Sequence, residues 1–99
     1  MTASLVVGVD AGGTKLAVRA ETPDRVRVAD VALPAEGWSA SPPEAAAHWL
    51  DARIRRVLPV GATIAALGVG AQGLDTVEHA HELRGALGGL GYRAEVVND

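Results

Sequence analysis

Val7–Lys15 reads VGVDAGGTK, and this stretch decides how the rest of the chain is interpreted. The apolar run Leu5–Val9 predicts a buried strand that ends at Asp10. Leu16–Ala20 predicts a second strand directly after the glycine turn. Two glycines at such a turn let the backbone approach a ligand closely and direct its N–H groups at an anion. The stretch is therefore a candidate anion-binding loop.

The remaining chain shows one more strand signal and then alternates between helix and strand. In Arg25–Val31 apolar and polar residues alternate, which predicts a third, half-exposed strand. Ser41-Pro42-Pro43-Glu44 is typical of a helix start, with Ser41 as the cap, and this helix is expected to end near Val57. The later expected elements are a strand over Thr63–Val69, a helix from about Asp75 to Leu87, and a strand over Arg93–Val97. The order β-β-β-α-β-α-β predicts an α/β fold, with a mixed sheet of about five strands and helices packed on it.

The composition argues against several classes of protein. The 99 residues have a net charge of −3, with acidic and basic residues mixed along the chain, so neither nucleic acid nor a membrane is expected as a partner. There is no cysteine, which excludes disulfide and thiolate chemistry within these residues. No basic segment precedes the first apolar run, so no signal peptide is expected and the default location is the cytoplasm.

Polar residues add chemistry to the glycine loop. Asp10 closes the first predicted strand, where its carboxylate could hold Mg²⁺, a hard cation that prefers oxygen ligands. Thr14 adds a hydroxyl donor, and Lys15 adds a positive charge. Gly-Gly is also common in plain hairpin turns, but that interpretation leaves Asp10 unexplained. A P-loop is excluded, because Thr14 stands where that motif requires lysine and because a strand follows.

A second glycine segment offers an alternative interpretation. Gly68–Gly73 (GVGAQG) matches the dinucleotide-binding fingerprint GxGxxG between a predicted strand and a predicted helix, and Asp99 ends the next strand. However, the separation between Gly68 and Asp99 exceeds the usual spacing of about 20 residues. A Rossmann domain also leaves the opening three strands without a role. This alternative is therefore the less favoured one.

Three segments with polar residues lie at the ends of predicted strands. They are Asp10, Gly70–Gly73 and the pair Asn98-Asp99. Ligands of open α/β sheets bind at the carboxyl ends of strands, so we expect these segments to converge at one edge. A carboxylate at that edge can accept a proton from an attacking hydroxyl, and a second carboxylate can organise a metal ion.

The sequence resembles the N-acetylglucosamine kinase and BadF/BadG/BcrA/BcrD ATPase family, within the sugar kinase and actin superfamily. The matching segments are Val7–Lys15, Leu67–Asp75 (LGVGAQGLD) and Val96–Asp99 (VVND), in that order. The resemblance implies a ribonuclease H-like, actin-like ATPase fold, with ATP bound between two such domains. Residues 1–99 would form the N-terminal part of the nucleotide-binding domain, without its final helix and second lobe. The resemblance further implies ATP and Mg²⁺ as cofactors and a sugar or amino sugar as substrate, and it allows a homodimer of the full-length protein.

The same resemblance assigns roles to individual residues. Gly12, Gly13 and Thr14 are expected to contact the phosphates, with Lys15 beside them, and Asp10 is expected to help organise Mg²⁺. Asp99 would be the catalytic carboxylate that binds and deprotonates the attacking sugar hydroxyl. The expected substrate-binding residues are Ser41, Gly73, Asn98 and Asp99. One departure concerns the loop before the first helix, where the kinases have an asparagine for the sugar and Glu36–Ser41 (EGWSAS) offers only serines.

The sequence predicts ATP-dependent transfer of a phosphoryl group to a hydroxyl of a small substrate, such as N-acetylglucosamine or glucosamine. Two other functions stay open: a BadF-type ATPase that activates a redox enzyme, and a non-catalytic nucleotide-binding module. Asp10 and Asp99 together favour a catalytic protein over the non-catalytic module. Because one half-site can neither position Mg-ATP nor exclude water around it, the isolated chain is expected to lack kinase activity.

Overall fold

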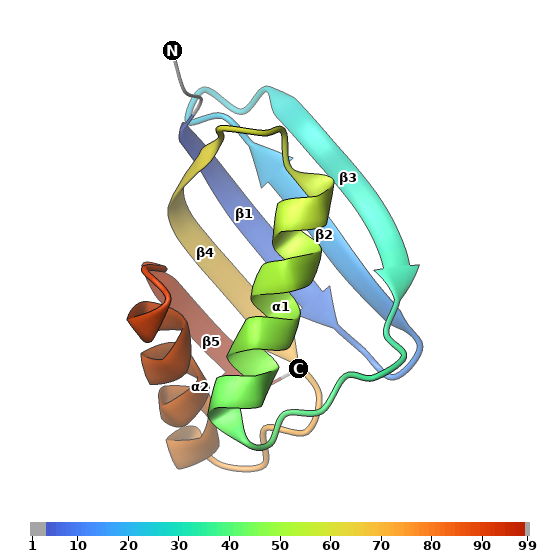
Figure 1. Ribbon diagram of the computed structural model, residues 1–99, viewed down its shortest axis with the longest axis vertical. Helices are drawn as coiled ribbons and strands as arrows, with labels where there is room; N and C mark the ends of the chain where they lie inside the picture. Colours follow the sequence, from blue (N-terminus) through green and yellow to red (C-terminus); the bar gives the residue numbers. More distant parts are fainter. Residues whose placement is uncertain (1–3, 99) are drawn as a thin grey trace.

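A computed structural model describes residues 4–98 of the chain. It has an α/β fold with one five-stranded mixed sheet and two helices, as the sequence predicts (Figure 1). The elements in chain order are β1 (Ser4–Ala11), β2 (Lys15–Glu21), β3 (Arg27–Pro34), α1 (Pro43–Val57), β4 (Thr63–Ala71), α2 (Val77–Gly89) and β5 (Ala94–Asn98).

The sheet combines an antiparallel half with a parallel half. Its strand order is β3-β2-β1-β4-β5, in which β1–β2 and β2–β3 pair antiparallel and β1–β4 and β4–β5 pair parallel. The parallel register places Asp10 beside Gly70 and Gly70 beside Val97. The carboxyl ends of β1, β4 and β5 therefore lie at one end of the sheet, next to the loop that joins β1 to β2 (Figure 1).

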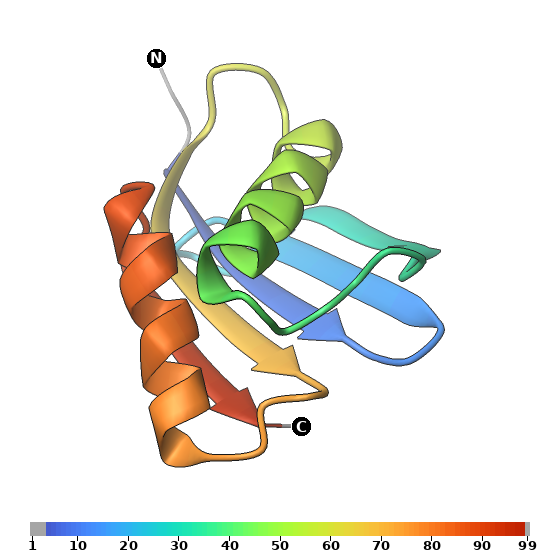
Figure 2. The ribbon, with the colours of Figure 1, turned by 60° about the horizontal axis from the view of Figure 1, so that its bottom comes forward.

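Both helices lie on the same face of the sheet, as Figures 1 and 2 show. The odd-numbered residues of β1, such as Leu5 and Val7, point to this face and are almost completely buried. They meet Leu50 and Ile54 of α1, while α2 buries its leucines over the parallel strands. Each fully buried aliphatic side chain of this size contributes roughly 1.5–3 kcal/mol through removal of apolar surface from water. Neither described helix has the length and apolar character that crossing a bilayer requires.

The opposite side of the sheet carries no helix among the described residues, and we call it the open face. Most of the side chains that alternate onto it are small or charged, and those of its central strands include Val6, Gly8, Asp10, Lys15, Ala17, Arg19, Gly68 and Gly70. Small residues leave the backbone of the central strands close to the surface. Asp10 and the charged residues of β2 consequently stand above a nearly flat floor.

The start of β3 differs from the prediction. Arg25 was expected in the strand but lies in a turn with φ of 67°, and β3 begins at Arg27 and extends to Pro34. The turn is closed by Thr22, whose hydroxyl donates to Asp24 at 2.5 Å and accepts from the amide of Val26 at 3.0 Å. Such local side-chain bonds compete with strand pairing, and here they delay it by two residues.

The predicted cap of the first helix is also wrong. Ser41 lies outside the helix, and the cap position is occupied by Pro42, which makes no side-chain capping hydrogen bond. A proline disfavours the helical conformation in the residue before it. Pro43 therefore keeps Pro42 extended, with φ of −72° and ψ of 158°, and the helix begins at Pro43 itself. The end of α1 at Val57 agrees with the prediction.

Candidate functional site

The loop between β1 and β2 presents two consecutive backbone amides to solvent. The amide of Gly12 closes the turn by donating to the carbonyl of Lys15 at 2.9 Å, and the carbonyl of Thr14 accepts from the amide of Ala35 at 3.1 Å. Gly13 and Thr14 are exposed, and within residues 4–98 their amides make no hydrogen bond. The two amides are therefore available to an anion, together with the Thr14 hydroxyl.

Asp10 and Lys15 flank this loop on the open face. Asp10 pairs with Ala17 across the antiparallel β1–β2 register, so Lys15 and Arg19 are its diagonal neighbours on β2. A shallow hollow of about 320 Å³ lies on this face, with Asp10, Arg19 and Asp30 along it and Gly8 and Ala17 as part of its floor. The carboxylate of Asp10 and the cation of Lys15 thus lie next to the exposed amides, while Arg19 lies further along β2, 3.7 Å from Asp30.

A second loop, after β4, lies against the first. The amide of Gln72 donates to the carbonyl of Ala11 at 2.9 Å, which extends the β1–β4 pairing into the loop. A Cβ atom on Gly13 would lie 3.4 Å from Oε1 of Gln72, so the amide side chain reaches the glycine loop. Gly73 follows with φ of 89°, a left-handed conformation that favours glycine. The two glycine loops therefore form one continuous rim at the end of β1 and β4.

Trp38 joins the loop between β3 and α1 to this rim, and Trp49 of α1 packs against Trp38. The indole Nε1 of Trp38 donates to the carbonyl of Gln72 at 3.3 Å. The Trp38 and Trp49 rings lie 5.4 Å apart at a tilt of 56°, and the guanidinium of Arg53 stacks on Trp49 at 3.8 Å from the ring centre. Aromatic and cation–π contacts of this kind hold the loop in a defined position.

Ser41 lies in this third loop, close to Gly73. A Cβ atom on Gly73 would lie 3.2 Å from Cβ of Ala40, the residue before Ser41. Ser41 is exposed, and its backbone carbonyl accepts a hydrogen bond of 2.9 Å from the hydroxyl of Ser39. Three loops therefore meet at this end of the sheet, and they contain Gly12 and Gly13, Gly73, and the segment with Ser41.

Asn98 takes a different position from the other predicted residues. It pairs with Ala71, which is buried beneath the helices, so its side chain points to the helix-bearing face and not to the open face. There it lines a hollow of about 400 Å³ with Thr76 and Val77 at the start of α2. Asp10 points to the opposite face, and the strands that carry the two residues, β1 and β5, lie two strand spacings apart, about 9–10 Å. The predicted catalytic residue Asp99 lies outside the described residues.

The residues present fit magnesium only as an ion shared with a ligand. Within residues 4–98, no three acidic or histidine side chains gather at one point. Mg²⁺ is commonly bound through one or two carboxylates, with water and substrate phosphates supplying the remaining ligands. The single carboxylate of Asp10, close to exposed amides that could hold a phosphate, fits that kind of site.

The structure also weighs against the dinucleotide-binding alternative. Gly68 and Gly70 lie inside β4, where they pair with Gly8 and Asp10 of β1. The fingerprint instead needs its first glycine in the turn between strand and helix. Only Gly73 lies in the connecting loop, and α2 begins four residues later at Val77. The glycines of β4 thus belong to the floor of the open face.

Two residues of this site were not among the predicted binding residues. Gln72 joins the two glycine loops, and Trp38 ties the third loop to them. The glutamine stands between two glycines in Gly70-Ala71-Gln72-Gly73, a position that marked the loop without assigning its side chain a role. Its contact with Gly13 depends on the β1–β4 pairing, which the sequence pattern does not specify.

No protein-family model matches the chain, and a search of curated proteins found no match either.

Proposed function

We propose that this chain carries the phosphate-binding part of an ATP-dependent phosphotransferase with a ribonuclease H-like, actin-like ATPase fold. The acceptor in this proposal is a hydroxyl group of a small substrate, an amino sugar such as N-acetylglucosamine or glucosamine. The observation that carries the proposal is the pair of exposed amides at Gly13 and Thr14, which stands beside the carboxylate of Asp10 at the ends of parallel strands. Backbone amides directed at one point form an anion site that does not depend on a helix.

In this proposal each residue of the loop has a separate role in binding the triphosphate. The amides of Gly13 and Thr14 bind phosphate oxygens, the Thr14 hydroxyl adds a donor, and Lys15 neutralises charge. Gly12 closes the turn through its bond to Lys15 and so keeps the loop in shape. Asp10 holds Mg²⁺, which would neutralise charge on the transferred phosphoryl group. Asp99 is the proposed base for the acceptor hydroxyl.

The proposal also gives the third loop a role in substrate binding. Ser41 and Gly73 lie on neighbouring loops that meet at Ala40, so a sugar bound beside the phosphates could contact both. Asn98 points to the other face of the sheet, which restricts its contact to a substrate that extends past the end of β4. The strand end, not the open face alone, is therefore the proposed place of transfer.

Binding of Mg-ATP to the 99-residue chain tests this proposal, because it requires the loop and not a complete catalytic centre. Trp38 is bonded to Gln72 at the rim, so tryptophan fluorescence and calorimetric titration should both report binding. We expect Asp10→Asn to reduce the Mg²⁺-dependent part of the affinity by about tenfold or more, a loss of about 1.4 kcal/mol. Thr14→Val should weaken binding of ATP with and without Mg²⁺.

The matched control is Asp24→Asn in the turn between β2 and β3, far from the rim, which removes the same charge. It should leave the affinity unchanged. If Asp10→Asn and Asp24→Asn weaken ATP equally, or if the unmodified chain binds ATP no better with Mg²⁺ than without it, the proposed role of the loop is wrong.

A further inference from the structure

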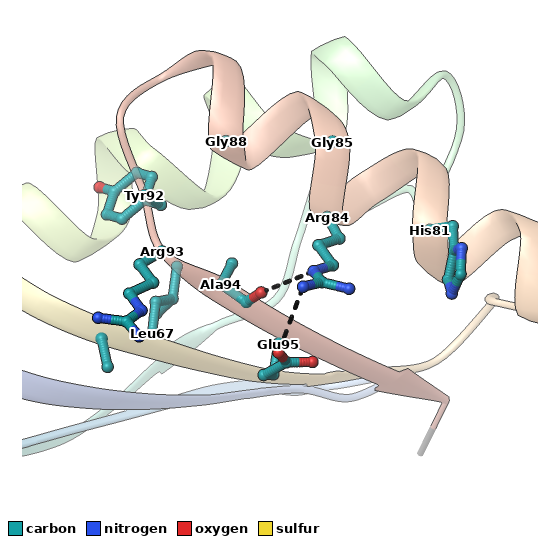
Figure 3. Close-up of a pocket in the computed structure, with 10 residues that line it drawn as sticks. Leu67, His81, Arg84, Gly85, Gly88, Tyr92, Arg93, Ala94 and Glu95 are labelled. Carbon is teal, nitrogen blue, oxygen red and sulfur yellow. Dashed lines mark hydrogen bonds and ion pairs between the residues drawn. The ribbon is translucent and has the colours of Figure 1, made fainter.

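A groove runs along the outer edge of β5, on the side of the molecule away from the hairpin strands. It has a volume of about 570 Å³ and is bounded by α2 and by the segment from Tyr92 to Glu95 (Figure 3). β5 is the last strand of the described sheet, so no further strand covers this edge within residues 4–98. The groove therefore has a strand edge as one wall and a helix as the other.

The backbone of β5 presents alternate residues to this groove. The carbonyl of Arg93 points toward β4, where it accepts from the amide of Leu67 at 2.9 Å. Polar groups of successive strand residues point to opposite sides, so Ala94 and Val96 direct their amides and carbonyls outward. The outward carbonyl of Ala94 accepts from Nε of Arg84 at 3.1 Å, as Figure 3 shows. A carbonyl has two lone pairs, so this bond leaves room for a second donor.

Arg93, which directly precedes β5, and Glu95 within it carry opposite charges, and both are exposed. Arg93 and Glu95 both project on the open-face side of the strand, on either side of Ala94. The guanidinium of Arg93 has no charged partner within residues 4–98, and Glu95 is held only by a 3.5 Å contact with Arg84, in which its side chain is 80% exposed. An antiparallel copy of the same strand, paired at Ala94, would place each Arg93 directly opposite the Glu95 of the other copy.

The part of α2 that lines the groove has two glycines and therefore projects few side-chain atoms into it. Gly85 and Gly88 line the groove, and a Cβ atom added at either would meet nothing within 4 Å. Glycine inside a helix costs about 0.5–1 kcal/mol relative to alanine, so these positions lower the stability of the isolated helix. A second α2 helix lying beside the first would use the space that the two glycines leave.

From these features we infer that two copies of this chain associate through β5, with the two strands antiparallel and Ala94 opposite Ala94 on the two-fold axis. The sheets then join into one, and the two α2 helices lie side by side on the same face. Two Arg93–Glu95 pairs, one on each side of the axis, fix the register. The inference does not depend on nucleotide binding, and the loops of the candidate site stay free at the end of each sheet.

The interface is small, since it consists of a five-residue strand and one helix face. We therefore expect a weak dimer with a dissociation constant on the order of micromolar. Arg84 must share the Ala94 carbonyl or turn away when the partner strand arrives. Its side chain is half exposed, and exposed ion pairs such as Arg84–Glu95 contribute little, so this rearrangement opposes association only slightly.

A charge-swap experiment tests the register as well as the surface. Sedimentation velocity over a range of concentrations should show a monomer–dimer equilibrium for the unmodified chain. Arg93→Glu and Glu95→Arg should each weaken self-association by tenfold or more, because each places like charges opposite one another. An equimolar mixture of the two variants should dimerise again, since every cross-strand pair in the mixed dimer is then attractive.

Arg25→Glu, a charge reversal in the turn between β2 and β3, is the matched control and should leave association unchanged. Circular dichroism and thermal unfolding establish that each variant is folded. A monomer at every concentration would overturn the inference. A dimer that is insensitive to both reversals, or a mixture that does not associate, would also overturn it.

Discussion

The indole Nε1 of Trp38 donates a hydrogen bond to the backbone carbonyl of Gln72, 34 residues further along the chain, at 3.3 Å. This bond joins the loop before α1 to the loop after β4. The amide of Gln72 in turn donates to Ala11, next to the glycine loop. Three loops from distant parts of the sequence are thus held in one rim by two hydrogen bonds to a single residue.

We predict that Trp38→Phe lowers the free energy of unfolding by about 1 kcal/mol, because it removes the bond to Gln72 and keeps an aromatic ring against Trp49. Urea unfolding measures this loss. Trp49→Phe is the comparison, since Nε1 of Trp49 is buried without a hydrogen-bond partner within the described residues. It makes the same change in side chain without losing a hydrogen bond, and it weakens only the stacking of Arg53 on the ring. A loss near zero for Trp38→Phe would show that the bond to Gln72 contributes nothing.

A second long-range contact predicts the response of stability to alkaline pH. Burial raises the pKa of Tyr92 above its ordinary value of 10.0, and the hydrogen bond that its hydroxyl donates to Asp51 raises it further. The unfolded chain therefore releases this proton at a lower pH than the folded chain does. The stability contribution is fully present below about pH 10 and is lost as the pH rises above it.

Unfolding free energies measured from neutral pH to above pH 10 should accordingly fall for the unmodified chain, by at most about 1.4 kcal/mol per pH unit for one proton. Tyr92→Phe should be less stable at neutral pH, because it leaves Asp51 without this donor, but it should lose the part of the decline that Tyr92 causes. Tyr92 is the only tyrosine, so tyrosinate absorbance assigns the ionisation directly. Parallel declines in the two proteins would contradict the prediction.

The elements that could be predicted from the sequence are those whose signal is local. The apolar run of β1 and the end of α1 at Val57 needed only neighbouring residues. The start of β3 differs from the prediction because the side chains of Thr22 and Asp24 and the amide of Val26 close a turn in competition with the strand. Contacts such as Trp38–Gln72 and Tyr92–Asp51 link residues 34 and 41 positions apart, and no local pattern encodes them.

For the candidate site, the sequence located the glycine loops but not the faces on which side chains project. Asp10 and Asn98 both lie near the ends of their strands, yet the register places them on opposite faces of the sheet. A shift of one residue in pairing would reverse either position. The direction of each side chain thus depended on the pairing of β1, β4 and β5, which follows from the packing of the whole sheet.

The N-termini of α1 and α2 differ in whether a side chain caps them, and this difference can be measured. The hydroxyl of Thr76 accepts from the amide of His79 at 3.1 Å and caps α2, whereas Ser41 lies outside α1. We predict that Thr76→Ala costs about 1 kcal/mol of unfolding free energy and that Ser41→Ala costs a few tenths or less. Chemical denaturation of the two variants measures both losses. A loss of about 1 kcal/mol for Ser41→Ala would show that Ser41 does cap α1.

Two features disfavour any residue other than glycine at position 73: the positive φ and the close approach of Ala40. Substitutions at Gly73 and at Gly61 should separate these two effects. Its φ of 89° costs any residue with a Cβ roughly 1–2 kcal/mol, and the added atom would lie 3.2 Å from Cβ of Ala40. Gly61 has φ of 85° but open space around it, so Gly61→Ala carries the backbone cost alone. We therefore expect Gly73→Ala to lower the free energy of unfolding by about 1 kcal/mol more than Gly61→Ala, since the loop before α1 must move to admit the methyl group. That movement should also change the fluorescence of Trp38, whereas Gly61→Ala should leave the fluorescence unaltered. Equal losses of unfolding free energy and unchanged spectra in both variants would show that the two loops are not in contact.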